Sequence, residues 1–535
     1  MNMTINKLHF IYSAISMAVI LNSFSCKANK ELPEPEETKD KYTTISDRGY
    51  VLYSDFNAKG DGKTDDIDAI AEAHTYANQH KYPVKADQGV TYFISGKSRT
   101  AEIRTDTDFG TALFVIDDTN VQNRNSPVFT VSSNLETFKP SGVTNLKINQ
   151  TKVAATWPGP CLVTAVNSNV KRYIRYGVNQ NSGSSQTDVF LVDANGNVDM
   201  NAPIIWDFDQ ITDLKALPID ETTLTIKGGR FTTIANKETL NNSYYNRGIA
   251  IRRSNVVVDG VEHRVTGEGE LGAPYTGFLN ISDCAFVTVR NTILTGHKTS
   301  ITIDSAGEKV SRGTYDISVT RAVNISFVNC SQANDIMDTK FWGIMGTNYC
   351  KNLSLDRCTF SRFDAHMGVA NATIRNSTLG YQGINAIGSG VLTVENSTIN
   401  GKTLINLRSD YGSTWHGEFI IRNCVFVPGG GSSLIASLIG GSNRGQHDFG
   451  YTCYMPERIT FENLRIDDSN HPASYNGPAI FANFNSAMKD DSYVELFPYI
   501  ITREVILRNV TTTSGKTLRV SENPFMFRNV KVTVE

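Results

Sequence analysis

Three short segments in the C-terminal half of the chain carry side chains that could move protons or hold an anion. Removing the C5 proton of a uronic acid needs a base, an acid for the leaving oxygen, and a cation that neutralises the neighbouring carboxylate. Histidine titrates near neutral pH, lysine acts as a base only when its pKa is lowered, and arginine stays charged. We therefore predict a catalytic set in which Lys298 or His297 transfers the proton, His366 is the competing base, and Arg362 and Arg408 hold the carboxylate.

The same segments contain side chains suited to holding a sugar. Tyr411 and Trp415 could stack on a sugar ring or cover an edge of the fold. The carboxylates beside Arg362 and Arg408 could bind substrate or only form local ion pairs that brace a loop, and His297, Lys298 and His366 could equally lie at solvated corners or turns. The predicted substrate-binding set is Asp364, Asp410, Tyr411, Trp415 and His416.

The charge distribution favours an anionic polymer and leaves the reaction open. Residues 285–425 contain 13 Lys or Arg and 10 Asp or Glu, whereas the whole chain has a net charge of −3. A balance so near zero argues against a dedicated nucleic-acid-binding protein. A glycoside hydrolase would instead need two carboxylates, a C5-epimerase shares the proton abstraction of a lyase, and a glycan-binding solenoid needs no catalyst. The carboxylate candidates for hydrolysis are Asp304, Asp335, Asp338, Asp364 and Asp410.

A repeat in the C-terminal half predicts how these segments are brought together. Seven segments alternate apolar and polar residues and then place Asn, or once Arg357, before a small residue. Alternation is typical of strands, and Asn favours tight or left-handed corners. The separations of 19 to 40 residues suit coils of a parallel β-solenoid with loops, in which equivalent positions stack about 4.8 Å apart. Cys330, Cys358 and Cys424 share one position of the repeat, which predicts an internal ladder of small side chains.

The N-terminal part carries a recognisable motif. Residues 55–73 read DFNAKGDGKTDDIDAIAEA, and VTYFISG follows at 90–96. This resembles the start of the right-handed parallel β-helices of the pectate-lyase superfamily. The resemblance implies an all-β, single-stranded right-handed parallel β-helix over residues 45–535. It also implies an N-terminal capping α-helix from about residue 65 to 80, with Thr64 as a candidate cap.

The first 44 residues predict an address and a tether. Lys7 precedes an apolar run that is too short to span a membrane comfortably, and a Ser-Cys pair follows it. The segment resembles a bacterial lipoprotein signal that ends in a lipidated Cys26, with Ser23 departing from the usual pattern. Residues 27–44 are charged and contain proline, which predicts a flexible tether. We expect a monomeric outer-membrane lipoprotein displayed at the cell surface, with the periplasmic face as the alternative.

Together these features resemble the surface polysaccharide lyases of gut Bacteroidetes. That resemblance implies β-elimination in a uronic-acid-containing polysaccharide, most simply a glycosaminoglycan such as chondroitin sulfate, dermatan sulfate or hyaluronan. The acidic cluster of calcium-dependent pectate lyases is not recognisable, so the metal requirement is unknown and Ca²⁺ stays open as a cofactor. The run Asp193-Ala-Asn195-Gly196-Asn197-Val-Asp199 resembles a calcium loop only faintly, because its glycine is misplaced, and it favours a hairpin turn around Asn195-Gly196.

Overall fold

The structure is a computed structural model that describes residues 36–176, 182–238, 243–303 and 307–535. The chain divides into two units, Met1–Arg48 and Gly49–Glu535, which are taken separately. The predicted signal segment and Cys26 lie outside the described residues. In the first unit, helix α1 (Glu36–Arg48) replaces the later part of the expected tether. This part of the sequence has no Pro or Gly, begins with acidic residues and ends with Arg48, which suits a helix and its dipole.

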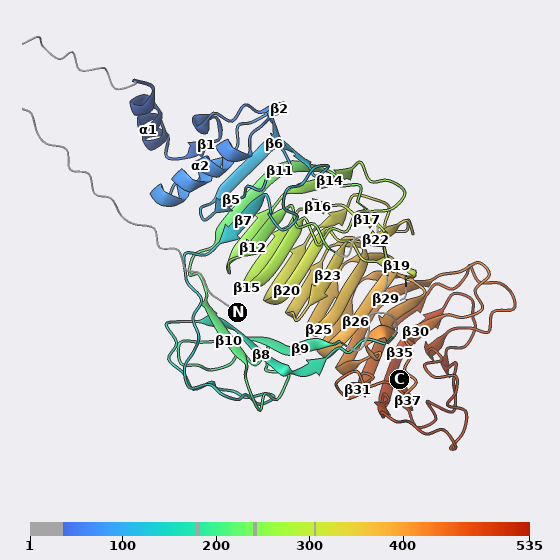
Figure 1. Ribbon diagram of the computed structural model, residues 1–535. Helices are drawn as coiled ribbons and strands as arrows, with labels where there is room; N and C mark the ends of the chain where they lie inside the picture. Colours follow the sequence, from blue (N-terminus) through green and yellow to red (C-terminus); the bar gives the residue numbers. More distant parts are fainter. Residues whose placement is uncertain (1–35, 177–181, 239–242, 304–306) are drawn as a thin grey trace, which may run out of the picture. The chain divides into compact units, whose positions relative to one another are not determined.

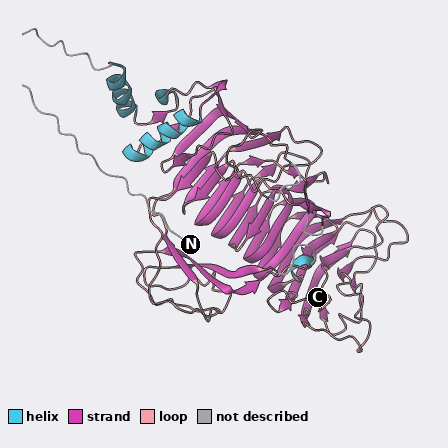
Figure 2. Cartoon of the chain, in the orientation of Figure 1, coloured by secondary structure: helices cyan, strands magenta, loops and turns pink. Residues whose placement is uncertain are grey.

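The second unit is a parallel β-helix, as the repeat and the resemblance predicted. In Figures 1 and 2 its strands lie side by side in successive coils. One column of paired strands consists of β5 (Ala101–Ile103), β7 (Phe129–Ser132), β12 (Ile249–Arg252), β15 (Leu279–Arg290), β20 (Ile317–Val328), β23 (Met345–Asn348), β25 (Thr359–Arg375), β26 (Thr378–Glu395), β28 (Thr403–Leu407), β30 (Ser437–Gly440), β33 (Ala479–Phe481) and β36 (Arg519–Ser521). This column forms the floor of the candidate site described below.

Two further columns complete the coils. The long strands β15, β20, β25 and β26 bend from one column into the next. The second column adds β3 (Val84–Lys85), β6 (Thr107–Asp117), β11 (Leu224–Ile234), β13 (Val256–Asp259), β24 (Lys351–Asp356), β29 (Trp415–Pro428), β32 (Arg458–Ile466), β35 (Glu504–Thr512) and β37 (Lys531–Val534). The third adds β2 (Asp61–Asp65), β4 (Thr91–Ile94), β14 (Glu262–Thr266), β16 (Ile293–Leu294), β21 (Ser331–Gln332) and β27 (Thr398–Gly401), and β1 (Val51–Leu52) pairs with β3.

Several short elements lie outside the three columns of strands. The outer pairs are β17 (His297–Lys298) with β22 (Phe341–Gly343), β18 (Ser300–Ile303) with β19 (Lys309–Arg312), and β31 (Cys453–Tyr454) with β34 (Tyr499–Ile500). Two 3₁₀ turns, η1 (Ser54–Phe56) and η2 (Ser409–Tyr411), complete the set. Among the described helices, none is long and apolar enough to cross a membrane.

The predicted corners and internal ladder are both present. The Asn residues of the repeat adopt positive φ, and Arg357 does so at the same position with φ 54°. Side-chain amides connect successive corners; Asn329, for example, donates to Asn291 Oδ1 at 2.8 Å. The cysteines of the repeat are buried free thiols, and the backbone N–H of Cys358 donates to Ser377 Oγ at 3.0 Å. These ladders fix the register that determines which side chains meet on the outside.

Helix α2 (Ile67–His80) covers the first coils, close to the predicted bounds. Its apolar face packs inward, and His74 lies edge-on to Phe129 of β7 with ring centres 6.0 Å apart. The expected cap at Thr64 is wrong. Thr64 lies in β2, where its hydroxyl donates to Asp61, and Asp66 instead occupies the position immediately before the helix.

An insert interrupts the coils between β7 and β11. It contains the antiparallel strands β8 (Cys161–Arg172), β9 (Ser184–Val192) and β10 (Asp213–Pro218), with their own core around Phe190 and Phe208. A second apolar cluster joins Leu162 and Val189 of the insert to Ala285 and Val323 of the coils. The repeat did not predict this insert, because its sequence lacks the corner Asn pattern.

Candidate active site

Strand β25 presents three of the predicted polar residues on one outward face. Arg362, Asp364 and His366 alternate with Phe363 and Ala365, whose side chains are completely buried inside the coil. Parallel pairing then places Asn385 of β26 beside Asp364, and Asn406 of β28 beside Asn385. The amide of Asn406 donates to Asn385 Oδ1 at 2.8 Å. The solenoid therefore builds a polar strip across neighbouring coils from residues that are remote in sequence.

Arginines and aspartates form a connected cluster on this strip. Arg362 Nη2 contacts Asp364 Oδ2, and Arg408 Nη1 lies 3.6 Å from Asp364 Oδ1. Arg408 Nη2 also donates to Asp410 Oδ2 at 2.7 Å. From the insert, Arg175 Nη2 lies 3.1 Å from the same oxygen of Asp410. Three guanidinium groups thus face two carboxylates, which leaves one positive charge at the centre of the site.

The exposed side of this cluster is formed by Arg175 and Arg408. The Arg175 side chain is 47% exposed and that of Arg408 15%, whereas Asp364 is fully enclosed. Burial by itself lowers the pKa of Arg408, but the charges of Asp364 and Asp410 outweigh it and raise that pKa. Arg408 is therefore a permanent cation at the surface of a buried ionic network, the arrangement that suits recognition of a carboxylate.

His366 lies beside this cluster as a neutral imidazole. Burial lowers its pKa well below the usual value, and the charge of Arg408 lowers it further. Its Nδ1–H donates to Asn348 Oδ1 at 2.8 Å. That bond directs the lone pair to Nε2, which has no hydrogen bond to any described residue. A neutral histidine with a fixed tautomer and an unengaged Nε2 is chemically competent as a base.

Two tyrosines complete the surroundings of the cluster. The ring of Tyr411 stands edge-on to His366 with centres 5.3 Å apart, and Arg408 lies 5.7 Å from the Tyr411 ring centre. Burial raises the pKa of Tyr411. Burial also raises the pKa of Tyr315 to about 12, with opposing effects from the charges of Arg362 and Asp364. Both phenols are protonated at neutral pH and could donate a proton.

The structure brings together six of the predicted residues: Arg362, Asp364, His366, Arg408, Asp410 and Tyr411. It also adds residues that the sequence did not single out. Asn348 lies on the preceding coil, Arg175 comes from the insert, and Tyr315 precedes β20. Spacing within the repeat could have indicated Asn348, since its strand pairs with β25. Nothing in the sequence pattern connects Arg175 to this strip.

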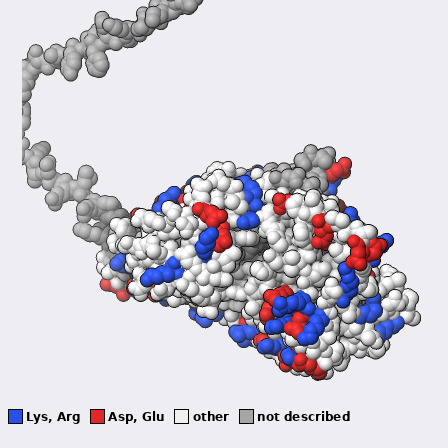
Figure 3. Space-filling view, turned by 90° about the horizontal axis from the view of Figure 1, so that it is seen from below, with Lys and Arg blue, Asp and Glu red and all other residues white. Residues whose placement is uncertain are grey.

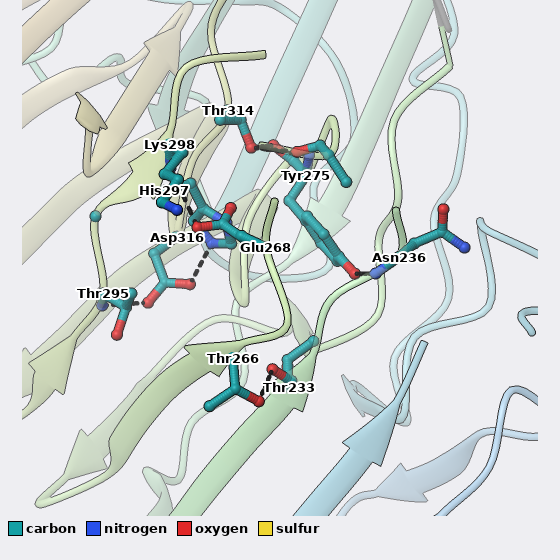
Figure 4. A network of polar contacts seen from close by, with 12 residues as sticks. Thr233, Asn236, Thr266, Glu268, Tyr275, Thr295, His297, Lys298, Thr314 and Asp316 are labelled. Atoms are coloured by element: carbon teal, nitrogen blue, oxygen red, sulfur yellow. Dashed lines mark hydrogen bonds and ion pairs between the residues drawn. The ribbon is translucent and has the colours of Figure 1, made fainter. Parts of the chain in front are cut away.

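His297 is not available as a proton-transfer group, which corrects the prediction. Figure 4 shows it between Asp316 and Glu268, and its side chain is 1% exposed. Its Nε2–H donates to Asp316 Oδ1 at 3.1 Å, and Nδ1 lies 3.5 Å from Glu268 Oε1. The adjoining cavity measures only about 10 Å³, far too small for a sugar. His297 lies on β17, and the pairing of β17 with β22 orients its side chain toward the interior.

Lys298 is partly accessible, but its contacts lead away from the arginine cluster. Its Nζ donates to the backbone oxygen of Gly269 at 2.5 Å, and its backbone N–H faces Glu268. Figure 4 shows Lys298 beside Glu268 at the edge of the buried network. In the part of the chain that is described, no contact joins Lys298 to Arg362 or Arg408. Its predicted role as base has no geometric support.

The two remaining predicted residues, Trp415 and His416, lie in different environments. Trp415 is 0% exposed, and its indole N–H donates to the backbone oxygen of Gly390 at 2.9 Å. It therefore fills the core, and the prediction that it stacks on sugar is wrong. The reason is register, because β29 pairs Trp415 with Gly388 and points the indole into the coil. His416, the next residue, is exposed and stacks on Tyr454 with ring centres 4.3 Å apart.

The acidic residues considered for hydrolysis do not form a free pair. Asp335 and Asp338 accept the backbone N–H groups of Met337 and Lys340 and so stabilise turns. Asp364 and Asp410 are both engaged by arginine. Asp304 lies outside the described residues. No two of these carboxylates face an open groove in the described structure.

The described residues show no cluster of metal ligands. They contain no group of three or more His, Cys, Asp or Glu side chains that could hold a metal ion. Asp193 Oδ1 accepts the backbone N–H groups of Asn195 and Asn197, at 2.8 and 2.9 Å. This segment is therefore the predicted hairpin turn rather than an open ligand loop.

Basic and acidic side chains lie interspersed on the face of the molecule shown in Figure 3. Such a surface provides no broad positive field to attract an anion from a distance. Recognition of an anionic polymer would depend on local groups such as the Arg175–Arg408 edge.

Comparison with known proteins gives matches to solved structures only. No family model matches the chain, and no curated protein does. The tailspike gp49 of Pseudomonas phage LKA1 shares 12% identity over 89% of this chain and 83% of its own, with a TM-score of 0.48. The tailspike gp61 of Pseudomonas phage phi297 shares 12% identity over 86% and 80%, with a TM-score of 0.47. The Gp54 tailspike of Acinetobacter baumannii bacteriophage AP22 shares 10% identity over 89% and 74%, with a TM-score of 0.42.

Proposed function

We propose that this protein is a polysaccharide lyase that cleaves a uronic-acid-containing polysaccharide, most simply a glycosaminoglycan, by β-elimination. The observation that carries the proposal is the neutral His366 beside a cluster of three arginines and two aspartates. β-Elimination needs a base and a cation within reach of one sugar, and this strip supplies both.

The roles follow from the geometry of the strip. Arg408 and Arg175 neutralise the uronate carboxylate, which makes the C5 proton more acidic. His366 accepts that proton at Nε2, while Asn348 holds the opposite ring nitrogen. Tyr411 donates a proton to the leaving O4 oxygen as the C4–O4 bond breaks and a C4=C5 double bond forms. Arg362 positions Asp364 and thereby Arg408, without needing contact with the sugar itself.

A glycoside hydrolase is the second candidate, and the site favours it less. Hydrolysis requires two carboxyl groups on either side of the glycosidic bond. Asp364 and Asp410 are both bound to Arg408, and Asp364 is fully enclosed. Neither is free to approach a glycosidic oxygen.

The reaction is tested by mixing the purified chain with hyaluronan, chondroitin sulfate, dermatan sulfate, alginate and polygalacturonate. A lyase releases an unsaturated uronate that absorbs ultraviolet light, and His366→Ala should abolish that signal. Release of reducing ends without the absorbance would assign hydrolysis instead.

A further inference from the structure

A separate pocket lies between the insert and the coils. It has a volume of about 340 Å³ and is lined on one side by Tyr173 and Trp206, and on the other by Ser389, His416 and Tyr454. None of these residues belongs to the arginine cluster. Gly368 and Gly388 form part of its wall, and a Cβ on Gly368 would lie 2.7 Å from the Tyr173 hydroxyl. A side chain at Gly368 would therefore displace that tyrosine.

Aromatic rings provide the main surfaces of this pocket. His416 and Tyr454 stack with their planes 21° apart, and the histidine is exposed. Trp206 is backed by Arg172, whose guanidinium lies 4.6 Å from the ring centre. Flat rings held in place by packing are surfaces on which the apolar face of a sugar ring can lie.

Two residues that line this pocket carry polar atoms without partners. The indole N–H of Trp206 and the hydroxyl of Ser389 are buried and make no hydrogen bond within the described structure. Leaving such groups unpaired is costly. Unsatisfied polar atoms in the wall of the pocket suit a ligand rich in hydroxyl groups better than an apolar ligand.

The charges around the pocket argue against a second uronate. Arg172 is the only arginine among the described residues that line the pocket, and it is already occupied. Its Nε donates to Gln186 Oε1 at 2.9 Å, and its Nη1 donates to the backbone oxygen of Gly450. Burial lowers the pKa of Arg172. Asp207 in the same wall would repel a carboxylate. The pocket thus suits an uncharged sugar.

Its position connects it to the arginine cluster. Gly368 follows His366 by two residues on β25, so both lie on the same strand. Tyr173 of the pocket is edge-on to Tyr411, with ring centres 6.2 Å apart, and Tyr411 is edge-on to His366. One bound chain could reach both places.

We propose that this pocket is a binding subsite for an uncharged pyranose unit of the polysaccharide. The choice of polymer rests on the proposed function, because the arginine cluster would hold the neighbouring uronate. The protein would therefore prefer polymers that alternate a uronate with an uncharged sugar over polymers made only of uronates.

Affinity electrophoresis of the full chain tests this subsite directly. All proteins carry His366→Ala so that the polymer stays intact, and the gels contain either hyaluronan or polygalacturonate. Tyr454→Ala and His416→Ala are compared with His80→Ala and Tyr82→Ala, which alter another surface His–Tyr pair, with ring centres 6.4 Å apart, at the far cap. Loss of one aromatic surface should weaken hyaluronan binding roughly tenfold and leave polygalacturonate binding unchanged.

Two results would overturn the subsite: hyaluronan binding that survives both pocket variants, or an equal loss on both polymers. Because His416 is exposed, its alanine variant should stay folded, and an unchanged melting curve checks this. The lyase proposal is tested independently of the subsite. If pocket variants lose hyaluronan binding while the unmodified chain releases no unsaturated uronate, the subsite stands and the reaction does not.

Discussion

Lys351 places its Nζ atom 2.7 Å from Asp188 Oδ1, with both side chains 1% exposed. Lys351 belongs to strand β24 of the coils and Asp188 to strand β9 of the insert, so the pair joins the two parts. Lys351 also donates to the backbone oxygen of Pro203. Burial lowers the pKa of Lys351 and raises that of Asp188, and the attraction between them opposes both shifts. This pair and the apolar cluster described above together hold to the coils the insert that supplies Arg175 and one side of the aromatic pocket.

Breaking this pair should destabilise the protein strongly. Lys351→Met leaves a buried carboxylate without its cation, which costs about 3–5 kcal/mol of unfolding free energy. The double variant Lys351→Met with Asp188→Leu removes both charges and should recover a large part of that loss. Denaturant unfolding measures both. Lys215→Met, at an exposed pair, is the control and should change stability by less than about 0.5 kcal/mol. Equal losses in the single and double variants would contradict this account of the pair.

The catalytic strip should respond to single substitutions. His366→Ala and Arg408→Ala should each lower turnover by about 10²–10⁴-fold, because each removes a group that acts on the reacting sugar. Arg290→Ala, which disrupts an exposed ion pair with Asp259, is the matched control. Melting curves establish that each variant is folded. Activity within about threefold of the parent for both site variants would place the reaction elsewhere.

The two tyrosines should separate in their effects. Tyr411→Phe removes the proposed proton donor and should lower turnover by about 10²-fold or more. Tyr315→Phe should have a smaller effect, since Tyr315 interacts with Arg362 and Asp364 rather than with His366. Steady-state rates on the polymer identified by the product assay distinguish them. The reverse order of effects would reassign the acid to Tyr315.

The pH dependence of activity should show that the His366 imidazole stays uncharged well into the acidic range. Its folded-state pKa is lowered, so the free base persists as pH falls through the ordinary histidine range. We expect the acidic limb of the kcat/KM profile to lie below about pH 6.5, the usual histidine pKa. A limb centred at or above that value would show that His366 is not the base.

The pH dependence of stability should report on His297 instead. Burial by itself lowers its pKa, but the hydrogen bond to Asp316 and the nearby Glu268 carboxylate outweigh burial and raise that pKa to about 9. Its contribution to stability is full below the unfolded-state pKa of about 6.5 and is lost as pH rises through about 9. Unfolding measured across this window should show that decline, and His297→Gln should remove it. An unchanged slope in the variant would rule out this histidine as its source.

Membrane attachment depends on Cys26 in our proposal. Cys26→Ala should move the protein from the membrane fraction to the soluble fraction, because a lipid chain is the expected anchor. Fractionation of cells that express both forms, followed by immunoblotting, measures this. Membrane association that survives the substitution would require another anchor.

The sequence predicted the repeating parts of the molecule and failed at the unique parts. Corner residues such as Asn291 and Asn329 reveal the coil because every turn of the solenoid needs a left-handed corner. The prediction for Trp415 was wrong because the alternation of apolar and polar residues in β29 does not by itself determine which face points inward. Arg175 was missed because it lies in an insert with no repeat, and long-range packing against Asp410 brings it to the site.

Release of an unsaturated uronate tests the central claim most directly. The unmodified chain and its His366→Ala variant are incubated with the panel of uronate polymers, and ultraviolet absorbance is followed together with reducing ends. We predict that absorbance and reducing ends rise together on at least one polymer, and that neither rises with the variant. Reducing ends without absorbance, C5 proton exchange without cleavage, or retention of the polymer without any product would each contradict the lyase and indicate a hydrolase, an epimerase or a binding protein.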